Sequence, residues 1–441
     1  MRGSPIDVRG GSTNAESRRA LLASWIGWMF DGYESYAFVL VMPTAIGQLL
    51  PASQAGDLSF YAGAALTAML LGWATGGVIA GVLTDYIGRK RVLMVSILWY
   101  AVSAGLTAFV PSYRALVVLR FLTGLGLGAE WGSGTAMVAE FWPAAWRGRA
   151  AGVLQSGFGA GFFLASGIWF FVAPLGPESW RSLFLIGVLP SFFLIYIRRN
   201  VNDSPLWRAA RERRRAAQQR RAQGGAVGDD DRLAGFTIAV LLSDRSMRRR
   251  VALLLLMSLS TVVGWWSVST WIPLFASQLA ESQGLEPQRW ASLAGLTYNV
   301  GAIAGYLVFG VLADARGRKP TISVYYAGSL VLSLCLFLLV RNPAVLLVVA
   351  AVNGFFTLGQ FSWMAVYLPE LFPTGIRGSA ISLVFNVSRY VAAFGPLAAG
   401  WIISTTGSLA GTAAALSLIY ILGLIVTPGA GPETRGEPLP E

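Results

Sequence analysis

The sequence predicts an all-α membrane protein of twelve transmembrane helices, arranged as two pseudo-symmetric bundles of six. Three observations lead to this prediction. The 441-residue chain is 55% hydrophobic and only 13% charged, whereas about 25% of the residues of a soluble domain are charged. Its apolar stretches approach the ~20 residues that a helix needs to cross a bilayer. In addition, the second half of the chain repeats the glycine and charge positions of the first half.

The twelve apolar stretches define the expected helices. The first six are expected at 21–50, 58–84, 91–110, 114–139, 148–173 and 181–198, and the last six at 250–279, 290–313, 320–340, 343–368, 377–404 and 408–428. They give a first bundle over 21–198 and a second bundle over 250–428. The remaining segments are expected to be cytoplasmic: an N-terminal tail 1–20, a basic linker 199–249 and a C-terminal tail 429–441.

The basic residues indicate the orientation of the chain. If the N-terminus is inside, most of the 34 lysines and arginines lie on the cytoplasmic side, as the positive-inside rule requires. The loops on the outside carry Arg114, Arg181, Arg289 and Arg341. Both termini are therefore expected in the cytoplasm, which also follows from an even number of helices.

The composition excludes several kinds of site. The chain has one cysteine and no histidine, so an intrachain disulfide and an imidazole-based metal site are impossible. We expect neither a metal nor a cofactor. The net charge of +12 would suit nucleic acid in a soluble protein, but here the charges occupy loops beside a membrane. Nucleic acid is therefore not expected as a partner, whereas membrane lipid is.

A short charged turn between two apolar stretches occurs twice. GVLTDYIGRKRVLM (81–94) returns in the second half as GVLADARGRKPTI (310–322), and Glu140 and Arg147 return at nearly the same offset as Glu370 and Arg377. Such a repeat indicates two related halves. Transporters built in this way hold substrate near the bilayer midplane between the halves, which rock to expose it to each side in turn.

The turn Gly-x-x-x-Asp-x-x-Gly-Arg-Lys resembles the signature of the major facilitator superfamily of secondary transporters. This resemblance implies that Asp85 and Arg89 belong to a cytoplasmic latch between the halves, which helps to hold the outward-open state. A carboxylate beside a helix N-terminus gains about 0.3–1 kcal/mol, enough to bias two states. The expected gating residues are Asp85, Gly88, Arg89, Glu140, Arg147, Asp314, Arg318, Glu370 and Arg377.

Five charged residues lie inside apolar stretches, where each costs at least ~2.5–3.5 kcal/mol and therefore suggests a function. They are Asp31 and Glu34 in the first helix, Arg120 and Glu130 in the fourth, and Arg389 in the eleventh. Three acids thus face two arginines. If one acid is protonated when the site is loaded, a monoanion can bind beside an arginine. The alternative is that all five form structural ion pairs.

This imbalance predicts proton symport of an anion, because burial and neighbouring negative charge both favour the protonated form of a carboxyl group. The residues expected to couple the proton are Asp31, Glu34, Glu130 and Arg120. At the repeat positions of Glu130 and Arg120 stand Gln360 and Ala350, so coupling is expected in the first half only.

Arg389 is the residue expected to bind the substrate carboxylate, because it lies near mid-bilayer and its planar fork suits a carboxylate. Asn386 lies one turn earlier on the same helix face. Other polar or amphipathic residues are expected to line the cavity, although each alone is more often a helix–helix hydrogen bond: Tyr33, Gln155, Asn299, Gln360 and Trp363.

Three segments resemble the sialate:proton symporter family, which contains bacterial sialic acid transporters and fungal lactate/pyruvate permeases. They are DGYE at 31–34, GAEWGSG at 128–134 and NDSPLW at 202–207. By this resemblance, Asp31 and Glu34 match the acidic pair of the first helix, Arg120 the proton-coupling arginine and Glu130 the acid of the fourth helix. The first helix also resembles that of aromatic acid:proton symporters, and the fourth that of metabolite:proton symporters.

We therefore expect a transporter and not an enzyme: a proton-coupled importer of a small carboxylate, either a monocarboxylate or a sialate-like acid. It is expected in the bacterial inner membrane, working as a monomer. Three alternatives remain open. The chain can be a symporter of aromatic acids or other metabolites, a non-transporting sensor that signals through the linker 199–249, or a carrier of neutral sugars or drugs, which would have little use for Arg389.

Overall fold

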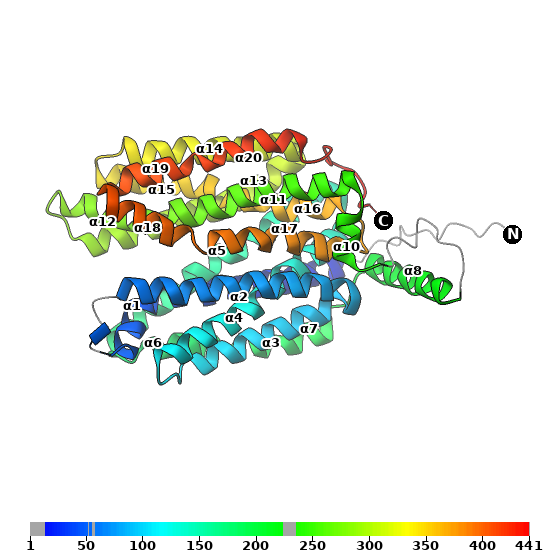
Figure 1. Ribbon diagram of the computed structural model, residues 1–441, viewed down its shortest axis with the longest axis horizontal. Helices are drawn as coiled ribbons and strands as arrows, with labels where there is room; N and C mark the ends of the chain where they lie inside the picture. Colours follow the sequence, from blue (N-terminus) through cyan, green and yellow to red (C-terminus); the bar gives the residue numbers. More distant parts are fainter. Residues whose placement is uncertain (1–13, 52, 55–57, 224–234, 441) are drawn as a thin grey trace.

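The computed structural model describes residues 14–51, 53–54, 58–223 and 235–440. Throughout these residues the regular structure is helical. In Figure 1, helices α1 to α4, α6 and α7 lie in the lower part and α11 to α20 in the upper part, with their long axes roughly parallel. The two predicted bundles are therefore visible as two groups of helices.

The first bundle contains six spans. Its helices are α1 (Asn14–Leu49), α2 (Leu58–Ile87), α3 (Arg89–Thr107), α4 (Tyr113–Phe141), α5 (Arg147–Val172), α6 (Trp180–Ile186) and α7 (Pro190–Asn200). The last predicted span of this bundle is divided between α6 and α7, and α7 begins at a proline. Proline suits the first turn of a helix because its missing N–H needs no partner there. Helix α1 extends back to Asn14, into the predicted tail 1–20, of which 1–13 lie outside the described residues.

The second bundle repeats this plan with more interruptions. Its helices are α11 (Arg245–Val268), α12 (Ile272–Glu281), α13 (Pro287–Arg316), α14 (Arg318–Leu338), α15 (Pro343–Thr357), α16 (Ser362–Leu371), α17 (Arg377–Ala392), α18 (Gly395–Thr406), α19 (Leu409–Ser417) and α20 (Ile419–Val426). Four predicted spans are each built from two consecutive helices. With these pairs counted as single spans, the predicted twelve are confirmed.

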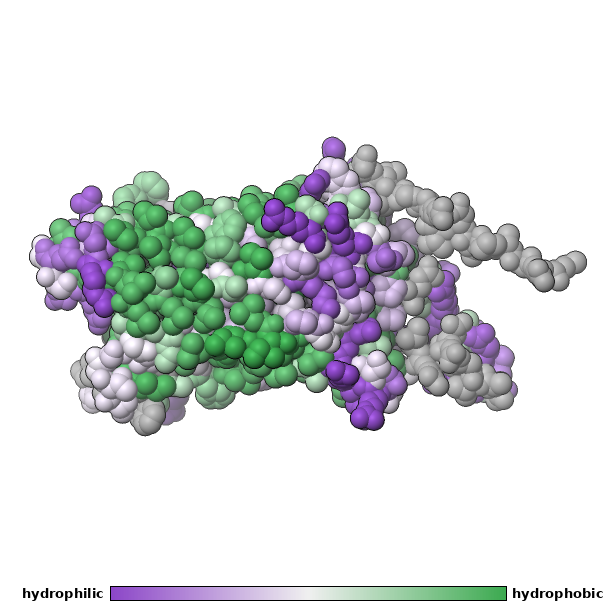
Figure 2. Space-filling model, turned by 90° about the horizontal axis from the view of Figure 1, so that it is seen from above, coloured by the Kyte–Doolittle hydropathy of each residue, from purple (hydrophilic) through white to green (hydrophobic). Residues whose placement is uncertain are grey.

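Nine helical segments of the described residues are long and apolar enough to cross a membrane on their own. The other three spans are α1, α3 and the pair α17–α18. Helices α1 and α3 are less apolar because they carry charged residues, among them Asp31 and Glu34 in α1 and Arg89 in α3, whereas α17 and α18 are separate helices of 16 and 12 residues. Figure 2 shows a broad hydrophobic band across the middle of the molecule, with hydrophilic residues gathered toward both ends.

Two linker helices mark one end of the molecule. Helix α8 (Pro205–Ala222), helix α10 (Thr237–Ser243) and the C-terminal segment lie together at the right of Figure 1. We call this the linker end and the other the opposite end. The linker predicted over 199–249 contains both helices and the start of α11, and its residues 224–234 lie outside the described part of the chain.

The two halves come into close contact at glycines, which have no side chain. The contacts between halves run along α2 with α17 and along α5 with α13. A Cβ atom on Gly310 of α13 would lie 2.4 Å from the Gly148 carbonyl oxygen of α5, and one on Gly81 of α2 would lie 2.2 Å from Cβ of Ser382 on α17. Any larger residue at these positions would push the halves apart.

Candidate functional site

One pair of the predicted intramembrane charges forms a buried ion pair. Arg120 on α4 binds Glu34 on α1, with 2.9 Å between Nη1 and Oε1. The same guanidinium donates to the hydroxyls of Thr107 and Thr123 and lies 4.5 Å from the ring centroid of Phe184. Every side of this buried arginine is therefore occupied by protein, and Glu34 rather than Glu130 is its acidic partner.

Asp31 and Glu130 face each other instead. Their carboxyl groups are buried and lie within hydrogen-bonding reach of each other. None of their four oxygens receives a hydrogen bond from the described protein atoms. Two buried carboxylates side by side are stable only when they share a proton, because like charges repel strongly away from water. The pair is thus arranged to bind a proton.

A glycine makes room for this acidic pair. Gly27 lies one turn before Asp31 on α1, and a Cβ atom there would be 1.6 Å from Oε1 of Glu130. Only glycine therefore allows the Glu130 carboxyl group to reach α1. Gly27 was not predicted as a site residue, and its position one helical turn from Asp31 was the only signal in the sequence.

Arg389 on α17 is buried and has no carboxylate partner among the described residues. Its side chain is 5% exposed, donates to Oδ1 of Asn386 at 3.0 Å and lies 3.8 Å from the ring centroid of Phe385 and 4.5 Å from that of Trp73. No acidic residue in the described part of the chain forms an ion pair with it, although the charge of Asp31 attracts it across the interface between the halves. A buried cation of this kind favours an anionic ligand.

Arg389 lines a small pocket between the halves. This inner pocket has a volume of about 20 Å³ and is lined from the first half by Gln155, Trp28 and Trp73 among others. The indole N–H groups of Trp28 and Trp73 are buried and lack acceptors among the described residues. The lining of this pocket therefore includes two indole donors that lack acceptors among the described residues, and a guanidinium that uses one N–H group on Asn386.

A larger cavity continues from the inner pocket toward the opposite end. It has a volume of about 210 Å³ and shares Phe158, Trp265 and Trp266 with the inner pocket, and we call it the outer cavity. A third cavity shares Tyr36, Pro273 and Gly295 with the outer cavity and reaches the start of α13. The three cavities therefore lie in series between the opposite end and Arg389, and we call this series the route.

The predicted cavity-lining residues divide into two groups. Gln155 lines the inner pocket, where its Oε1 accepts from Trp131 at 2.7 Å, and Asn299 lines the outer cavity. The others do not line these cavities and bond within their own half. Tyr33 donates to the Leu183 carbonyl, Gln360 to the Thr357 carbonyl, Trp363 to the Thr261 hydroxyl and Asn386 to the Ser382 carbonyl.

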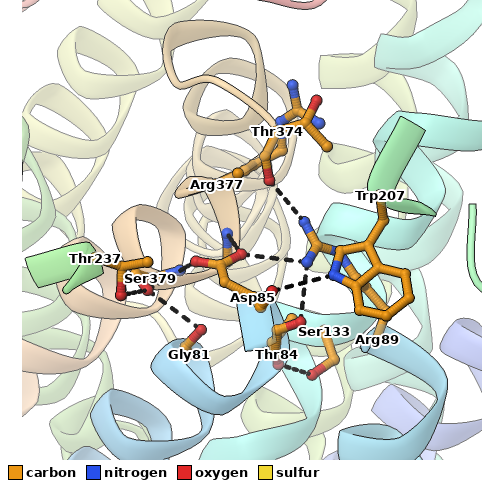
Figure 3. A network of polar contacts seen from close by, with 12 residues as sticks. Gly81, Thr84, Asp85, Arg89, Ser133, Trp207, Thr237, Thr374, Arg377 and Ser379 are labelled. Carbon is orange, nitrogen blue, oxygen red and sulfur yellow. Dashed lines mark hydrogen bonds and ion pairs between the residues drawn. The ribbon is translucent and has the colours of Figure 1, made fainter. Parts of the chain in front are cut away.

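At the linker end, Asp85 joins the two halves (Figure 3). Its carboxylate accepts from the backbone N–H groups of Gly378 and Ser379, at 3.0 and 2.8 Å, and from the Ser379 hydroxyl at 2.7 Å. These N–H groups belong to the first turn of α17, where a helix lacks internal acceptors and attracts negative charge. Asp85 therefore caps a helix of the other half. Its own half holds it through Arg89, at 3.2 Å.

Glu140 and two arginines extend this contact. Oε1 of Glu140 binds Arg89 of the first half at 2.9 Å and Arg377 of the second half at 3.0 Å. The other Glu140 oxygen accepts from the hydroxyl of Ser204, the residue that caps α8. We call the contacts of Asp85, Arg89, Glu140 and Arg377 the first latch.

The second copy of the motif builds an equivalent second latch. Asp314 accepts from the N–H groups of Gly148 and Arg149, both at 3.0 Å, and so caps α5 from the other half. Glu370 binds Arg147 at 2.9 Å and Arg318 at 2.8 Å. All the predicted gating residues that carry charge therefore lie in the two latches, and each latch crosses the interface between the halves.

The repeat extends beyond the predicted gating residues. The backbone of Gly88 has φ 107° and that of Gly317 φ 106°, a conformation that favours glycine. After each glycine a helix begins, and an acid caps it: Asp203 accepts from the N–H of Lys90, and Glu433 from those of Arg318 and Lys319. Asp203 and Glu433 occupy equivalent positions in the two halves, with the same offset as Glu140 and Glu370, so the repeat itself was a signal for both.

Comparison with known proteins agrees with this architecture. Residues 20–441 match the family model described as "Sugar (and other) transporter". The probable 4-methylmuconolactone transporter of Cupriavidus pinatubonensis is 28% identical, covering 96% of this chain and 92% of the relative. The niacin transporter of Acinetobacter baylyi is 28% identical, covering 90% and 85%. The sialic acid transporter of Escherichia coli is 24% identical, covering 88% of each chain.

A solved structure supports the fold. The proton:xylose symporter of the major facilitator superfamily superposes with a TM-score of 0.76 at 19% identity, covering 97% of this chain and 98% of the symporter. At this level of identity the likeness establishes the shared fold. Since the family model covers nearly the whole chain, the chain belongs to the "Sugar (and other) transporter" family of the major facilitator superfamily and is a membrane transporter, not an enzyme.

Proposed function

We propose that the protein imports a small organic carboxylate together with a proton. The observation that carries the proposal is Arg389, a buried arginine without an acidic partner among the described residues, at the inner end of a route between the halves. A carboxylate is the ligand that best matches its fork geometry. Two relatives are named for carboxylic acids, niacin and sialic acid, which supports the same class of substrate.

The Asp31–Glu130 pair supports proton coupling. The pair lies in the first half, and the negative charge of Asp31 attracts the positive charge of Arg389. No described residue donates a hydrogen bond to its carboxyl oxygens, so a proton shared between the two acids is what would stabilise them. When the pair carries a proton, its negative charge no longer competes with substrate for Arg389. When substrate leaves, the attraction between Asp31 and Arg389 is restored and the proton is released. Glu34 and Arg120, already paired, hold α1 against α4 during this cycle.

The proposed orientation places the linker end, with both termini, in the cytoplasm of a bacterial inner membrane. Both latches are then closed on the cytoplasmic side, while the route to Arg389 leads from the outside. Substrate and proton enter from outside, and rocking of the halves breaks the latches and opens the site to the cytoplasm. The protein is proposed to do this as a monomer, since the route lies between the halves of one chain.

Uptake into proteoliposomes tests the proposal. The wild type is assayed with labelled lactate, pyruvate, nicotinate, benzoate, muconate and sialate, with and without an inward proton gradient. We expect the gradient to drive accumulation of at least one acid. Arg389→Gln should lower its uptake about 10- to 100-fold, because a hydrogen bond to a charged group contributes roughly 1.5–3 kcal/mol.

Arg341→Gln is the matched control, since Arg341 is exposed at the start of α15 and away from the route. Unchanged uptake of every acid by Arg389→Gln would refute the carboxylate role of Arg389. Uptake that only equilibrates, whatever the gradient, would refute symport and leave the carboxylate role intact.

A further inference from the structure

The sizes of the two adjoining cavities indicate which part of the substrate each of them can hold. The inner pocket of about 20 Å³ has room for a group of one or two water molecules' size, such as a carboxylate. The outer cavity of about 210 Å³ is large enough for the rest of a small organic molecule. If Arg389 holds the carboxylate, as proposed above, the body of the substrate must lie in the outer cavity.

The walls of the outer cavity suit a flat apolar body. Tyr36 and Phe162 stack there with ring centroids 4.4 Å apart, and Trp265 and Trp266 lie 4.5 Å apart. Of the hydroxyls in the lining, that of Ser35 donates to the Asp31 carbonyl and that of Thr270 to the Trp266 carbonyl. Few groups remain that could bond to a substrate with many hydroxyls, whereas aromatic walls stack well on a conjugated one.

Asn299 supplies an amide acceptor in this apolar wall. Its Nδ2 donates to the Gly295 carbonyl at 3.0 Å, which fixes the orientation of the amide, because the reversed amide would set two oxygens against each other. Its Oδ1 is buried and has no donor among the described residues. The Ser269 hydroxyl, also in the lining, is likewise buried and has no hydrogen-bond partner within the described part of the chain. A buried unpaired acceptor beside a cavity requires a donor from whatever fills the cavity.

The order of the two cavities along α13 indicates the shape of the substrate. Asn299 lines the outer cavity, and Tyr306, seven residues further along α13, lines the inner pocket together with Arg389. Seven residues of helix correspond to about 10 Å. A molecule that binds both Arg389 and Asn299 therefore extends across the inner pocket and the outer cavity, with its carboxylate at one end and a donor at the other.

From these four observations we infer the substrate class: a flat, conjugated monocarboxylate with a hydroxyl or similar hydrogen-bond donor at the end remote from the carboxylate. Asn299 is the residue that selects for this donor. The inference rests on the proposed function, because it takes Arg389 as the carboxylate site. It also disfavours the sialate-like acid of the sequence prediction, whose many hydroxyls would lack partners in the outer cavity.

Four acids test the inference in the purified full-length protein: 4-hydroxycinnamate, 4-methoxycinnamate, cinnamate and the shorter 4-hydroxybenzoate. Binding is measured by calorimetry in detergent, and uptake is measured in proteoliposomes. We expect the wild type to bind 4-hydroxycinnamate about tenfold more tightly than the other three, as one neutral hydrogen bond allows. Asn299→Leu should remove this preference, so that the variant binds 4-hydroxycinnamate and cinnamate with affinities within about twofold of each other.

The outcomes separate the two proposals. Arg389-dependent binding of the acids with no preference for the hydroxyl, or a preference that Asn299→Leu retains, would refute this inference and leave the proposed function standing. Tighter binding of sialate than of all four acids would also refute it. If the wild type bound none of the four acids, this inference would fail, whereas the uptake panel of the proposed function would still decide that proposal separately. Because the comparison of the four acids needs no variant, it decides the matter even if Asn299→Leu does not fold.

Discussion

Two neighbouring acids of α1 have opposite surroundings although they are three residues apart. Glu34 binds Arg120 at 2.9 Å, whereas Asp31 faces Glu130 and has no cation within ion-pair distance among the described residues. Removing one member of a buried ion pair leaves an uncompensated charge and typically costs about 3–5 kcal/mol. Glu34 is therefore expected to support the fold, and Asp31 with Glu130 to carry the proton.

Gly27→Ala tests the acidic pair without changing any charge. Its Cβ would lie 1.6 Å from Oε1 of Glu130, so the carboxyl group must move away from Asp31. We expect proton-driven accumulation to fall about tenfold or more, while exchange of labelled for unlabelled substrate, which needs no net proton movement, persists. The measurement compares gradient-driven uptake with counterflow in the same liposomes.

Gly47→Ala is the control on the same helix. A Cβ there has no atom within 4 Å, and both changes gain the same helix propensity, up to about 1 kcal/mol. The two variants therefore differ chiefly in the contact with Glu130. Equal loss of accumulation in both would show that the acidic pair does not couple the proton.

At the scale of the helices, each latch contains an aspartate of one half that accepts hydrogen bonds from the first turn of a helix in the other half. Asp85 at the end of α2 caps α17, and Asp314 near the end of α13 caps α5. The helix contacts between the halves follow the same exchange, since α2 lies against α17 and α5 against α13. The duplication therefore explains the geometry of both latches: each half supplies the aspartate of one latch and the capped helix of the other.

Asp85→Asn should weaken the closed linker end. An asparagine still offers one acceptor oxygen, but it loses the negative charge beside the N-terminus of α17 and the ion pair with Arg89. The expected cost is about 1–3 kcal/mol. Spin labels on the exposed residues Arg91 and Arg316, in a Cys335→Ser background, report the separation of the halves by pulsed electron resonance. Asp85→Asn should increase the population of molecules with a longer distance between the two labels. An unchanged distribution of label distances would contradict the latch role of Asp85.

At the scale of the whole molecule, the structure is closed at the linker end, and its cavities lie in series from the opposite end to Arg389. Two latches hold this state, so breaking one leaves the other in place. For Asp85→Asn combined with Asp314→Asn, we expect a shift between the labels larger than the sum of the two single shifts, since contacts that act together are not additive. An additive or smaller shift would mean that the latches open independently.

The C-terminal segment adds to this closure. Beyond α20 it returns across the linker end, where Arg147 of the first half donates to the Glu437 carbonyl at 3.3 Å and Arg377 of the second half to the Pro440 carbonyl at 3.0 Å. Thr434 donates to Glu370 at 2.6 Å. The same arginines that join the halves thus also bind the segment that follows the last span.

The spans, the duplication and the charges inside the membrane could all be predicted from the amino-acid sequence. Apolar length and repeat spacing are properties of the chain alone, so the twelve spans and the pairs Asp85 with Asp314 and Glu140 with Glu370 followed from them. The superfamily was predicted from the same motif. Arg389 was identified because a charge in an apolar helix is conspicuous without any knowledge of its neighbours.

Which residues meet depends on how the helices pack. Arg120 binds Glu34 and not Glu130, and Trp28 and Trp73 surround Arg389, because the rotation of each helix is set by its packing. Close contacts at glycines such as Gly27 and Gly310 fix that packing. Tyr33, Gln360 and Trp363 likewise bond within their own half, away from the described route. A sequence shows which face of a helix is polar, but the opposing helix determines whether that face meets a charge, a ring or a cavity.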